Sequence, residues 1–536
     1  MGSNGNLSEF TIVKYARKIR ATPKEIVYNP RLLFSAALYA CAGIPITWDQ
    51  GSSSVVASLP GFQKHFGIDS GADAHKISNL VSLVYIGCGV GAGLSFFVND
   101  RIGRLWSLRL YMLVWIAGQM LATFAPNLRT LYAARIVSGL GIGPLTVTGT
   151  NSIVEIAPTE IRGLLATWFS VAMLLSLWVS VFCVYGVYQA IASSRLQYQV
   201  VWFGPCVFIL GCIMASFFIS ESPRWLFLVN QREKAIETLV SLRGLPVDHP
   251  RVSAELREIE EDIRELNEEN AVPGIRGIIR ETFCVSSNLR RLMQALISFA
   301  LAQLSGANSI SSYFVPILTL IGANNSTTHS LFLSGMYSIA KFFFTLMASF
   351  FFVDALGRRR SAFIGITIQI ITDLYIGIFI KYRQQGPVST SASQGAIAAI
   401  FFHGFGYAVG ISGLLILPYI FSGELWPNRI RSFGSAFSQM FHWLFFYGVN
   451  AGMPSLLGST DHWGAFILFA SFNCLALAYV FFMVPEMAGL GMEEMDDLFR
   501  GPWFKAYKRP RKGNVLTGEE AGDKVELVNR KDSCFQ

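Results

Sequence analysis

Residues 77–124 read ISNLVSLVYIGCGVGAGLSFFVNDRIGRLWSLRLYMLVWIAGQMLATF. Two apolar runs, Ile77–Val98 and Leu105–Phe124, are joined here by a short charged turn, Asp100–Arg104. Each run has about the 20 apolar residues that a helix needs to cross the hydrocarbon core of a bilayer. Backbone N–H and C=O groups in lipid must be satisfied within their own segment, so we expect each run to be a transmembrane helix.

The same alternation of apolar runs and polar turns continues through most of the 536-residue chain. The other runs lie at Leu33–Trp48, Leu128–Asn151, Leu164–Gln189, Val200–Ser220, Leu292–Ile321, Ser330–Val353, Ser361–Lys381, Gln394–Phe421, Phe433–Met453 and Trp463–Val484. The pattern predicts an all-α integral membrane protein with about 12 transmembrane helices in two six-helix, pseudo-symmetric bundles.

Composition excludes most other classes of protein. Hydrophobic residues make up 52% of the chain and charged residues 15%, whereas soluble domains carry roughly 25% charged residues. The net charge of +8 is concentrated in short segments between apolar runs, which is typical of membrane loops and not of a nucleic-acid-binding face. The sequence has no Walker A motif and no metal-ligand spacing of His or Cys. We therefore expect no enzyme activity, no cofactor and no metal site.

Lysine and arginine set the expected topology. Both ends of the chain and its polar centre are basic, and the positive-inside rule then puts both termini in the cytoplasm. The expected segments are a cytoplasmic tail at 1–31, a bundle at 32–220, a cytoplasmic linker with helices at 221–291, a bundle at 292–485 and a cytoplasmic tail at 486–536. Overlapping sequons at Asn324 and Asn325 fall on the outer side, where glycosylation is expected.

The two halves repeat the same charged motifs. Asp100–Arg104 follows the second run, and Asp354–Arg360 follows the eighth. Parallel halves of this kind characterise one large class of secondary transporters. Ion pairs at these helix ends would hold the cytoplasmic side closed, although ordinary topogenic charge is the alternative. The expected gate residues are Asp100, Arg101, Gly103, Arg104, Glu155, Arg162, Glu221, Arg224, Asp354, Gly357, Arg358, Arg359, Glu424 and Arg431.

Further motifs accompany the repeat. They include Trp48–Gly51, Arg135 with nearby glycines, Glu221–Leu226 and Gln303–Asn308. With the loop motifs they resemble the sugar porter family of the major facilitator superfamily over essentially the whole membrane region. Within that family the chain is most similar to fungal quinate and sugar-acid permeases, through Ser241–Pro250, Ser305–Ile310 and Val353–Ser361. The resemblance implies transport by alternating access.

Asp49 and Arg135 are the candidate proton-coupling pair. Asp49 is at the extracellular end of the first apolar run, where an unpaired carboxylate is costly, and Arg135 in the fourth run is the candidate partner. The resemblance implies that Asp49 takes up a proton. Protonation would weaken its pairing with Arg135 and bias the equilibrium between access states. A static ion pair that fixes helix packing is the alternative.

Polar and aromatic residues of the second half are the candidate substrate-binding groups. They are Gln303 and Asn308, followed by Ser312, Tyr313, Tyr419, Trp443 and His442. His403 and His442 are also candidates for contacting an anionic substrate or a proton, against packed neutral histidines. Lys341 lies near the middle of the eighth run. It is expected to attract a carboxylate or to extend toward the membrane surface, unless the boundary of the run is misplaced.

Departures from the family pattern bear on the substrate. Ala302 and Ser170 occupy positions where hexose carriers commonly have glutamine. A site that loses such donors and acceptors loses affinity for the sugar whose hydroxyls they bind. A sugar acid or a quinate-like cyclic acid is therefore the preferred substrate, and a hexose is second.

The function expected from the sequence is secondary active transport, by proton-coupled symport of a sugar, a sugar acid or a quinate-like solute in the plasma membrane. The expected partners are the small solute, the proton and the lipid bilayer, with no nucleic acid and no obligate protein partner. Two alternatives stay open. An exporter of a secondary metabolite would suit the apolar stretch Gly413–Leu417 of the tenth run, and a non-transporting nutrient sensor would signal through its cytoplasmic tails.

Overall fold

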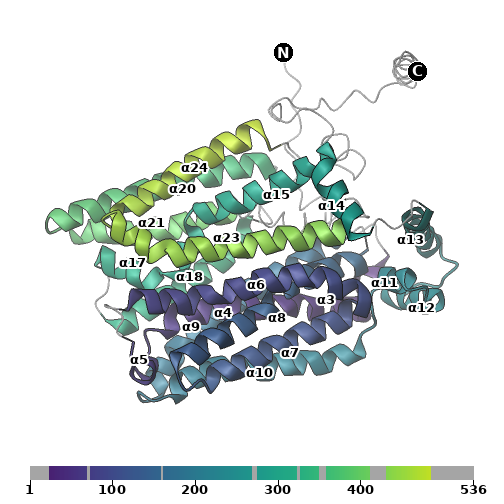
Figure 1. Cartoon of the computed structure of the whole chain (residues 1–536), viewed down its shortest axis with the longest axis horizontal. Helices are drawn as coiled ribbons and strands as arrows, with labels where there is room; N and C mark the ends of the chain where they lie inside the picture. Colours follow the sequence, from purple (N-terminus) through teal and green to yellow (C-terminus); the bar gives the residue numbers. More distant parts are fainter. Residues whose placement is uncertain are drawn as a thin grey trace, which may run out of the picture.

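The computed structural model describes residues 23–68, 73–158, 161–268, 274–322, 326–348, 358–410, 426 and 430–484. Regular structure in these ranges is helical, and long helices lie roughly side by side (Figure 1). Helices of the first half, purple to blue, lie below the green and yellow helices of the second half in this view. The fold is therefore the all-α membrane fold that the apolar runs predict.

The helices of the first half account for its six apolar runs. They are α2 (Lys24–Val27), α3 (Pro30–Ala40), η1 (Cys41–Gly43), α4 (Ile44–Val56), α5 (Pro60–Phe66), α6 (Ala74–Ile102), α7 (Arg104–Thr123), α8 (Leu128–Ile156), α9 (Arg162–Ala190), α10 (Leu196–Ala215) and η2 (Ser216–Phe218). The first apolar run does not end at Trp48, because the helix continues to Val56. Asp49 therefore lies within a helix and not at its end, which corrects the expectation.

The second half and the linker are also helical. The linker holds α11 (Pro223–Leu228), α12 (Arg232–Arg243), α13 (Pro250–Glu268) and α14 (Ile275–Cys284). The second half holds α15 (Ser286–Leu304), α16 (Ala307–Ser312), α17 (Phe314–Ile321), α18 (Thr327–Met347), α20 (Arg358–Gln385), α21 (Thr390–Val409), α23 (Arg431–Ser459) and α24 (Trp463–Phe482). Among the described residues, nine helical segments are long and apolar enough to cross a membrane.

Glycines let α6 and α8 pack closely. Gly87 of α6 lies against Gly139 of α8, and a Cβ at Gly143 would collide with the carbonyl oxygen of Cys88. Small residues that allow two backbones to approach are typical of helix contacts in membranes. The glycine-rich run of α6 therefore serves helix packing.

The seventh apolar run is broken at Gly306, which separates α15 from α16. Gly306 has a φ of +80°, and a Cβ there would meet the ring of Phe469. A side chain is disfavoured in this left-handed conformation, so glycine permits the break. Non-helical backbone inside a membrane is tolerated where it is buried in protein or lines a cavity. The break orients the polar residues that follow, including Asn308.

The most extensive contacts between the two halves are those of α6 with α23 and of α9 with α18. The ring of Tyr85 on α6 stacks on Trp443 of α23 at 5.8 Å between centroids. The hydroxyl of Ser78 donates to the carbonyl of Ala451, 3.2 Å away. These contacts bring the side chains of both halves around a shared centre.

Candidate functional site

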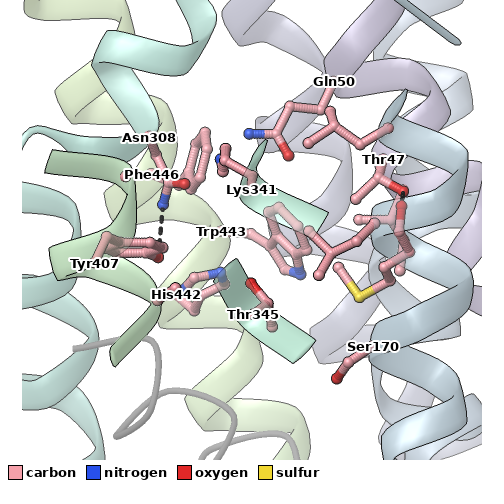
Figure 2. A pocket seen from close by; sticks show the side chains of 16 residues that line it. Thr47, Gln50, Ser170, Asn308, Lys341, Thr345, Tyr407, His442, Trp443 and Phe446 are labelled. Carbon is pink, nitrogen blue, oxygen red and sulfur yellow. Dashed lines mark hydrogen bonds between the residues drawn. The ribbon is translucent and has the colours of Figure 1, made fainter. Parts of the chain in front are cut away.

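A cavity of about 130 Å³ lies between the two halves (Figure 2). Helices α4 and α9 line it from the first half, and α16, α18, α21 and α23 from the second. Its lining residues with polar atoms in their side chains are Thr47, Gln50, Ser170, Asn308, Lys341, Thr345, Tyr407, His442 and Trp443. A cavity enclosed by both halves, with polar groups on several walls, is suited to a small polar solute.

Asn308 is the centre of a small hydrogen-bond network on one wall. Its Nδ2 donates to Oε1 of Gln303 at 2.9 Å. It also donates to the Tyr407 hydroxyl at 3.3 Å, the hydrogen bond drawn in Figure 2. The Nε2 of Gln303 is buried without a hydrogen-bond partner among the described residues. A buried donor of this kind is usually satisfied by water or a ligand. Gln303 thus lies directly behind the cavity wall, with Asn308 at its surface.

Trp443 connects the cavity to the other half of the protein. Its indole N–H donates to the Thr146 hydroxyl, 3.4 Å away on α8, and its ring stacks on Tyr85. His442 packs between aromatic rings, 4.6 Å from Phe299 and 4.9 Å from Trp443 between centroids. Both residues line the cavity.

Other predicted substrate residues lie elsewhere. Ser312 and Tyr313 are buried and are not among the lining residues, and the Tyr313 hydroxyl donates to the carbonyl of Asn450 at 2.9 Å. Tyr419 lies outside the described residues. Sequence reasoning missed Gln50 and Tyr407 as lining residues. For Gln50 a signal was present, because it directly follows Asp49 in the first-helix motif.

Asp49 and Arg135 form a buried, two-point ion pair. Nη1 of Arg135 lies 2.5 Å from Oδ1 of Asp49, and Nη2 lies 2.8 Å from Oδ2. Gln119 donates to the same carboxylate at 3.1 Å, and Arg135 also donates from Nε to the carbonyl of Leu80 at 2.9 Å. Both charged side chains are buried, with 2% of the Asp49 side chain and 1% of the Arg135 side chain exposed. Such a pair is strong and directional, and the next residue along α4, Gln50, reaches the cavity.

A second charge network connects three helix ends of the first half. Arg104 pairs with Glu155 at 3.0 Å and with Asp100 at 2.9 Å. The Glu221 carboxylate accepts the backbone N–H groups of Arg104 and Leu105, each 3.0 Å away. Burial raises the pKa of the Glu221 carboxyl above its ordinary value. The network therefore joins the start of α7, the end of α8 and the segment before α11.

The remaining gate residues are only partly described. Arg101 is exposed and Arg162 half-buried. Arg359 donates to the carbonyl of Phe481 at 2.7 Å. Asp354, Gly357 and Glu424 lie outside the described residues, as do the side chain of Arg358 and the sequons at Asn324 and Asn325. Contacts between the halves at this gate, and glycosylation at the sequons, stay predictions.

A third polar cluster is fully buried within the second half. His403 Nε2 lies 3.2 Å from Oδ1 of Asp373, and Asn473 donates to Oδ2 at 3.0 Å. Gln369 Nε2 lies 3.4 Å from the same ring nitrogen of His403. Asp373 is not among the site residues predicted from the sequence, although a carboxylate within an apolar run is a signal in itself.

Replacement of Asp373 by leucine is expected to destabilise the fold by about 3 kcal/mol, because it leaves His403 and Asn473 buried without their partner. Asp373→Asn keeps the shape and one acceptor oxygen, so it is expected to cost less. Thermal unfolding of the purified protein in detergent, followed by tryptophan fluorescence, measures both changes. Equal stability of Asp373→Leu and the parent protein would contradict a structural role for the cluster.

Known proteins are similar to this chain in sequence over most of its length. Residues 35–499 match the family model described as sugar (and other) transporter. The chain is 30% identical over 499 residues to a probable quinate permease of Aspergillus flavus, covering 91% of this chain and 92% of that protein. It is 29% identical over 496 residues to the quinate permease of Emericella nidulans, with the same two coverages.

Solved structures show the same fold. The proton:xylose symporter XylE bound to 6-bromo-6-deoxy-D-glucose superposes with a TM-score of 0.72 at 20% sequence identity. The match covers 88% of this chain and 100% of that chain. The inward-open form of the xylose transporter XylE from E. coli superposes with a TM-score of 0.66 at 20% sequence identity. The match covers 87% of this chain and 99% of that chain. The match to the transporter family and to the permeases shows that this is a secondary transporter of sugar-like solutes and not an enzyme. The fold and the apolar helices are those of a multi-pass membrane protein. The chain belongs to the sugar (and other) transporter family, the sugar porters of the major facilitator superfamily.

Proposed function

We propose that this protein is a proton-coupled symporter that imports a quinate-like cyclic acid or a sugar acid by alternating access. One observation carries the proposal: the buried Asp49–Arg135 pair lies beside a polar cavity formed by both halves. Two kinds of relative support it, because curated relatives are named quinate permeases and one structural neighbour is titled a proton:xylose symporter.

In the proposed cycle, solute and proton enter from the same side. A proton taken up by Asp49 neutralises the carboxylate and weakens its two contacts with Arg135. Solute hydroxyls bind Gln50, Asn308 and Tyr407 around the cavity. Because the cavity belongs to both halves, occupation changes the relative stability of the outward-facing and inward-facing states. Release on the other side returns the charge to Asp49 and restores the pair.

The cell context is part of the same proposal. The protein is placed in the plasma membrane with both termini in the cytoplasm, following the positive-inside rule. The Arg104–Glu155–Glu221 network then lies at the cytoplasmic face, where it stabilises the ends of three elements of the first half. The second-half motif at Asp354–Arg360 is proposed to act in the same way.

Uptake of labelled quinate, galacturonate and glucose into transporter-deficient yeast tests the proposal at acidic and neutral pH. Acid-stimulated uptake of quinate or galacturonate, abolished by a protonophore, is the expected result. Glucose uptake is expected to be weaker, because Ala302 and Ser170 lack the usual amides. Protein at the cell surface without uptake of any of the three solutes would overturn import and favour an exporter or a sensor.

A further inference from the structure

Lys341 is a buried base in the wall of the cavity. It lies on α18, and only 9% of the residue is exposed. It lines the cavity with Gln50 and Asn308, and Figure 2 shows it between these two side chains. An amine at this depth is costly in a membrane protein, and ionisable residues there are usually functional.

The neighbours of Lys341 do not neutralise it. Its Nζ donates to the Ser311 hydroxyl at 3.0 Å and lies 5.8 Å from the centroid of the Tyr337 ring. Within the part of the chain that the structure describes, no Asp or Glu forms an ion pair with it. The Ser311 hydroxyl and the Tyr337 ring can both contact an ammonium group, but neither carries the opposite charge.

Among the described residues, three other buried bases are paired with carboxylates. Arg135 has Asp49, Arg104 has Glu155, and Arg243 has Glu255 at 2.6 Å. Buried charges are normally paired, since desolvation of a lone charge is expensive. Arg109 is also buried without a carboxylate partner among the described residues, and its guanidinium donates to the hydroxyl and the carbonyl of Ser216. Lys341 differs from Arg109 because its amine lines a cavity in which a solute can supply the missing charge.

The direction of the side chain excludes extension toward the membrane surface. Lysines that extend in this way keep the amine in water while the stem covers apolar surface. The amine of Lys341 instead contacts Ser311 on α16, across the protein interior. The remaining lining residues include no acidic side chain, so the amine gives the cavity a positive potential.

We propose that Lys341 binds the carboxylate of the transported solute and makes the site selective for organic acids over neutral polyols. The inference deepens the proposed function and rests on the same cavity. A carboxylate bound at Lys341 would place the hydroxyl-bearing ring of the solute between the amides of Gln50 and Asn308. Charge selects the substrate class, and the amides select the hydroxyl pattern.

Competition between acids and their neutral analogues tests the proposal in the full-length protein. Labelled quinate uptake is challenged with unlabelled quinate or quinamide, and labelled galacturonate uptake with galacturonate or galactose. In the parent protein each acid is expected to compete at least tenfold better than its neutral analogue. Lys341→Met is expected to raise the KM for the acids about 10- to 100-fold, which is the factor that a hydrogen bond to a charged group contributes. The KM for the neutral analogues is expected to stay unchanged. Lys341→Arg is expected to retain part of the preference.

A matched substitution controls for the loss of a lysine. Lys381 is exposed on α20, with its Nζ 4.7 Å from the centroid of the Trp463 ring, and Lys381→Met is expected to keep the acid preference. An unchanged acid preference in Lys341→Met, or no preference in the parent protein, would overturn the proposal.

Ligand binding separates this inference from the proposed transport. Thermal stability of the purified protein in detergent is measured with quinate or quinamide. Stabilisation by quinate alone, lost in Lys341→Met, would support the carboxylate site even in a protein that takes up none of the solutes. Equal stabilisation by both compounds, or by neither, would overturn it whatever the transport result.

Discussion

Asp49→Asn is expected to abolish uphill accumulation of solute while sparing exchange of solute across the membrane. Asparagine has nearly the same shape as aspartate but neither takes up a proton nor carries charge. A pH difference of two units drives about a 100-fold accumulation through one proton, because each unit is worth about 1.36 kcal/mol. The accumulation ratio is therefore expected to fall from values of that order to about one.

The measurement compares two transport modes in the same cells. Net accumulation of labelled solute is recorded with an imposed pH gradient, and exchange is recorded from preloaded cells at equal pH. Asp461→Asn is the matched control, since Asp461 is exposed in the turn between α23 and α24 and is expected to behave as the parent protein. Full accumulation by Asp49→Asn would exclude the carboxylate as the coupling group.

Arg135 is not equivalent to Asp49 in this test. Removal of the guanidinium would leave the Asp49 carboxylate buried without its positive partner, and breaking a buried pair in this way costs about 3–5 kcal/mol. Loss of transport in an Arg135 variant would therefore mix coupling with folding. Asp49→Asn also removes one charge of the pair, but it reproduces the uncharged state that Asp49 takes in the proposed cycle and still offers a hydrogen-bond acceptor to Arg135 and Gln119.

The membrane fold could be predicted from the sequence because lipid leaves few choices. Apolar runs of the required length must be helices, and the repeated Asp100–Arg104 and Asp354–Arg360 motifs indicated two related halves. The length of the first helix could not be predicted in the same way. Beyond Trp48 the chain turns polar, yet Gly51, Ser52 and Ser53 continue the helix buried among other helices, so hydropathy marked its end too early.

The site was predicted in part for a similar reason. Charged groups such as Asp49 and Arg135 stand out in apolar runs, and their mutual pairing follows from the cost of burial. Cavity-lining groups do not stand out, because Tyr407 and Thr345 look like ordinary helix residues until the other helices surround them. The break at Gly306 decides which side chains of the seventh run reach the cavity, so Asn308 lines it while Ser312 does not.

Arg104→Ala is expected to produce the largest loss of stability in the charge network of the first half. Arg104 is the cation between Glu155 and Asp100, and its backbone N–H donates to Glu221. The side chains of Arg104 and Glu155 are each only 12% exposed, so loss of the cation leaves a carboxylate poorly solvated beside a second one. We expect a cost of about 3 kcal/mol in thermal unfolding of the purified protein.

Asp100→Ala provides the matched comparison within the same network. The Asp100 side chain is 45% exposed, and an exposed ion pair contributes only about 0.5 kcal/mol. The two alanine variants therefore remove opposite partners of one ion pair with unequal expected effects. Equal losses of stability would show that the Arg104–Asp100 pair, and not Glu155, dominates the network.

A double variant distinguishes the loss of a contact from the stranding of a charge. If the main cost of Arg104→Ala is the unpaired Glu155 carboxylate, then Glu155→Gln in the same chain removes that charge and restores part of the stability. The amide also keeps an acceptor for the Ser222 hydroxyl, which lies 2.6 Å from the Glu155 carboxylate. Non-additivity of 1 kcal/mol or more is expected for directly contacting residues, about the range measured in such cycles. Additive losses would instead mean that each side chain stabilises its own helix end, and that α7 and α8 are joined by their packing along the rest of their length.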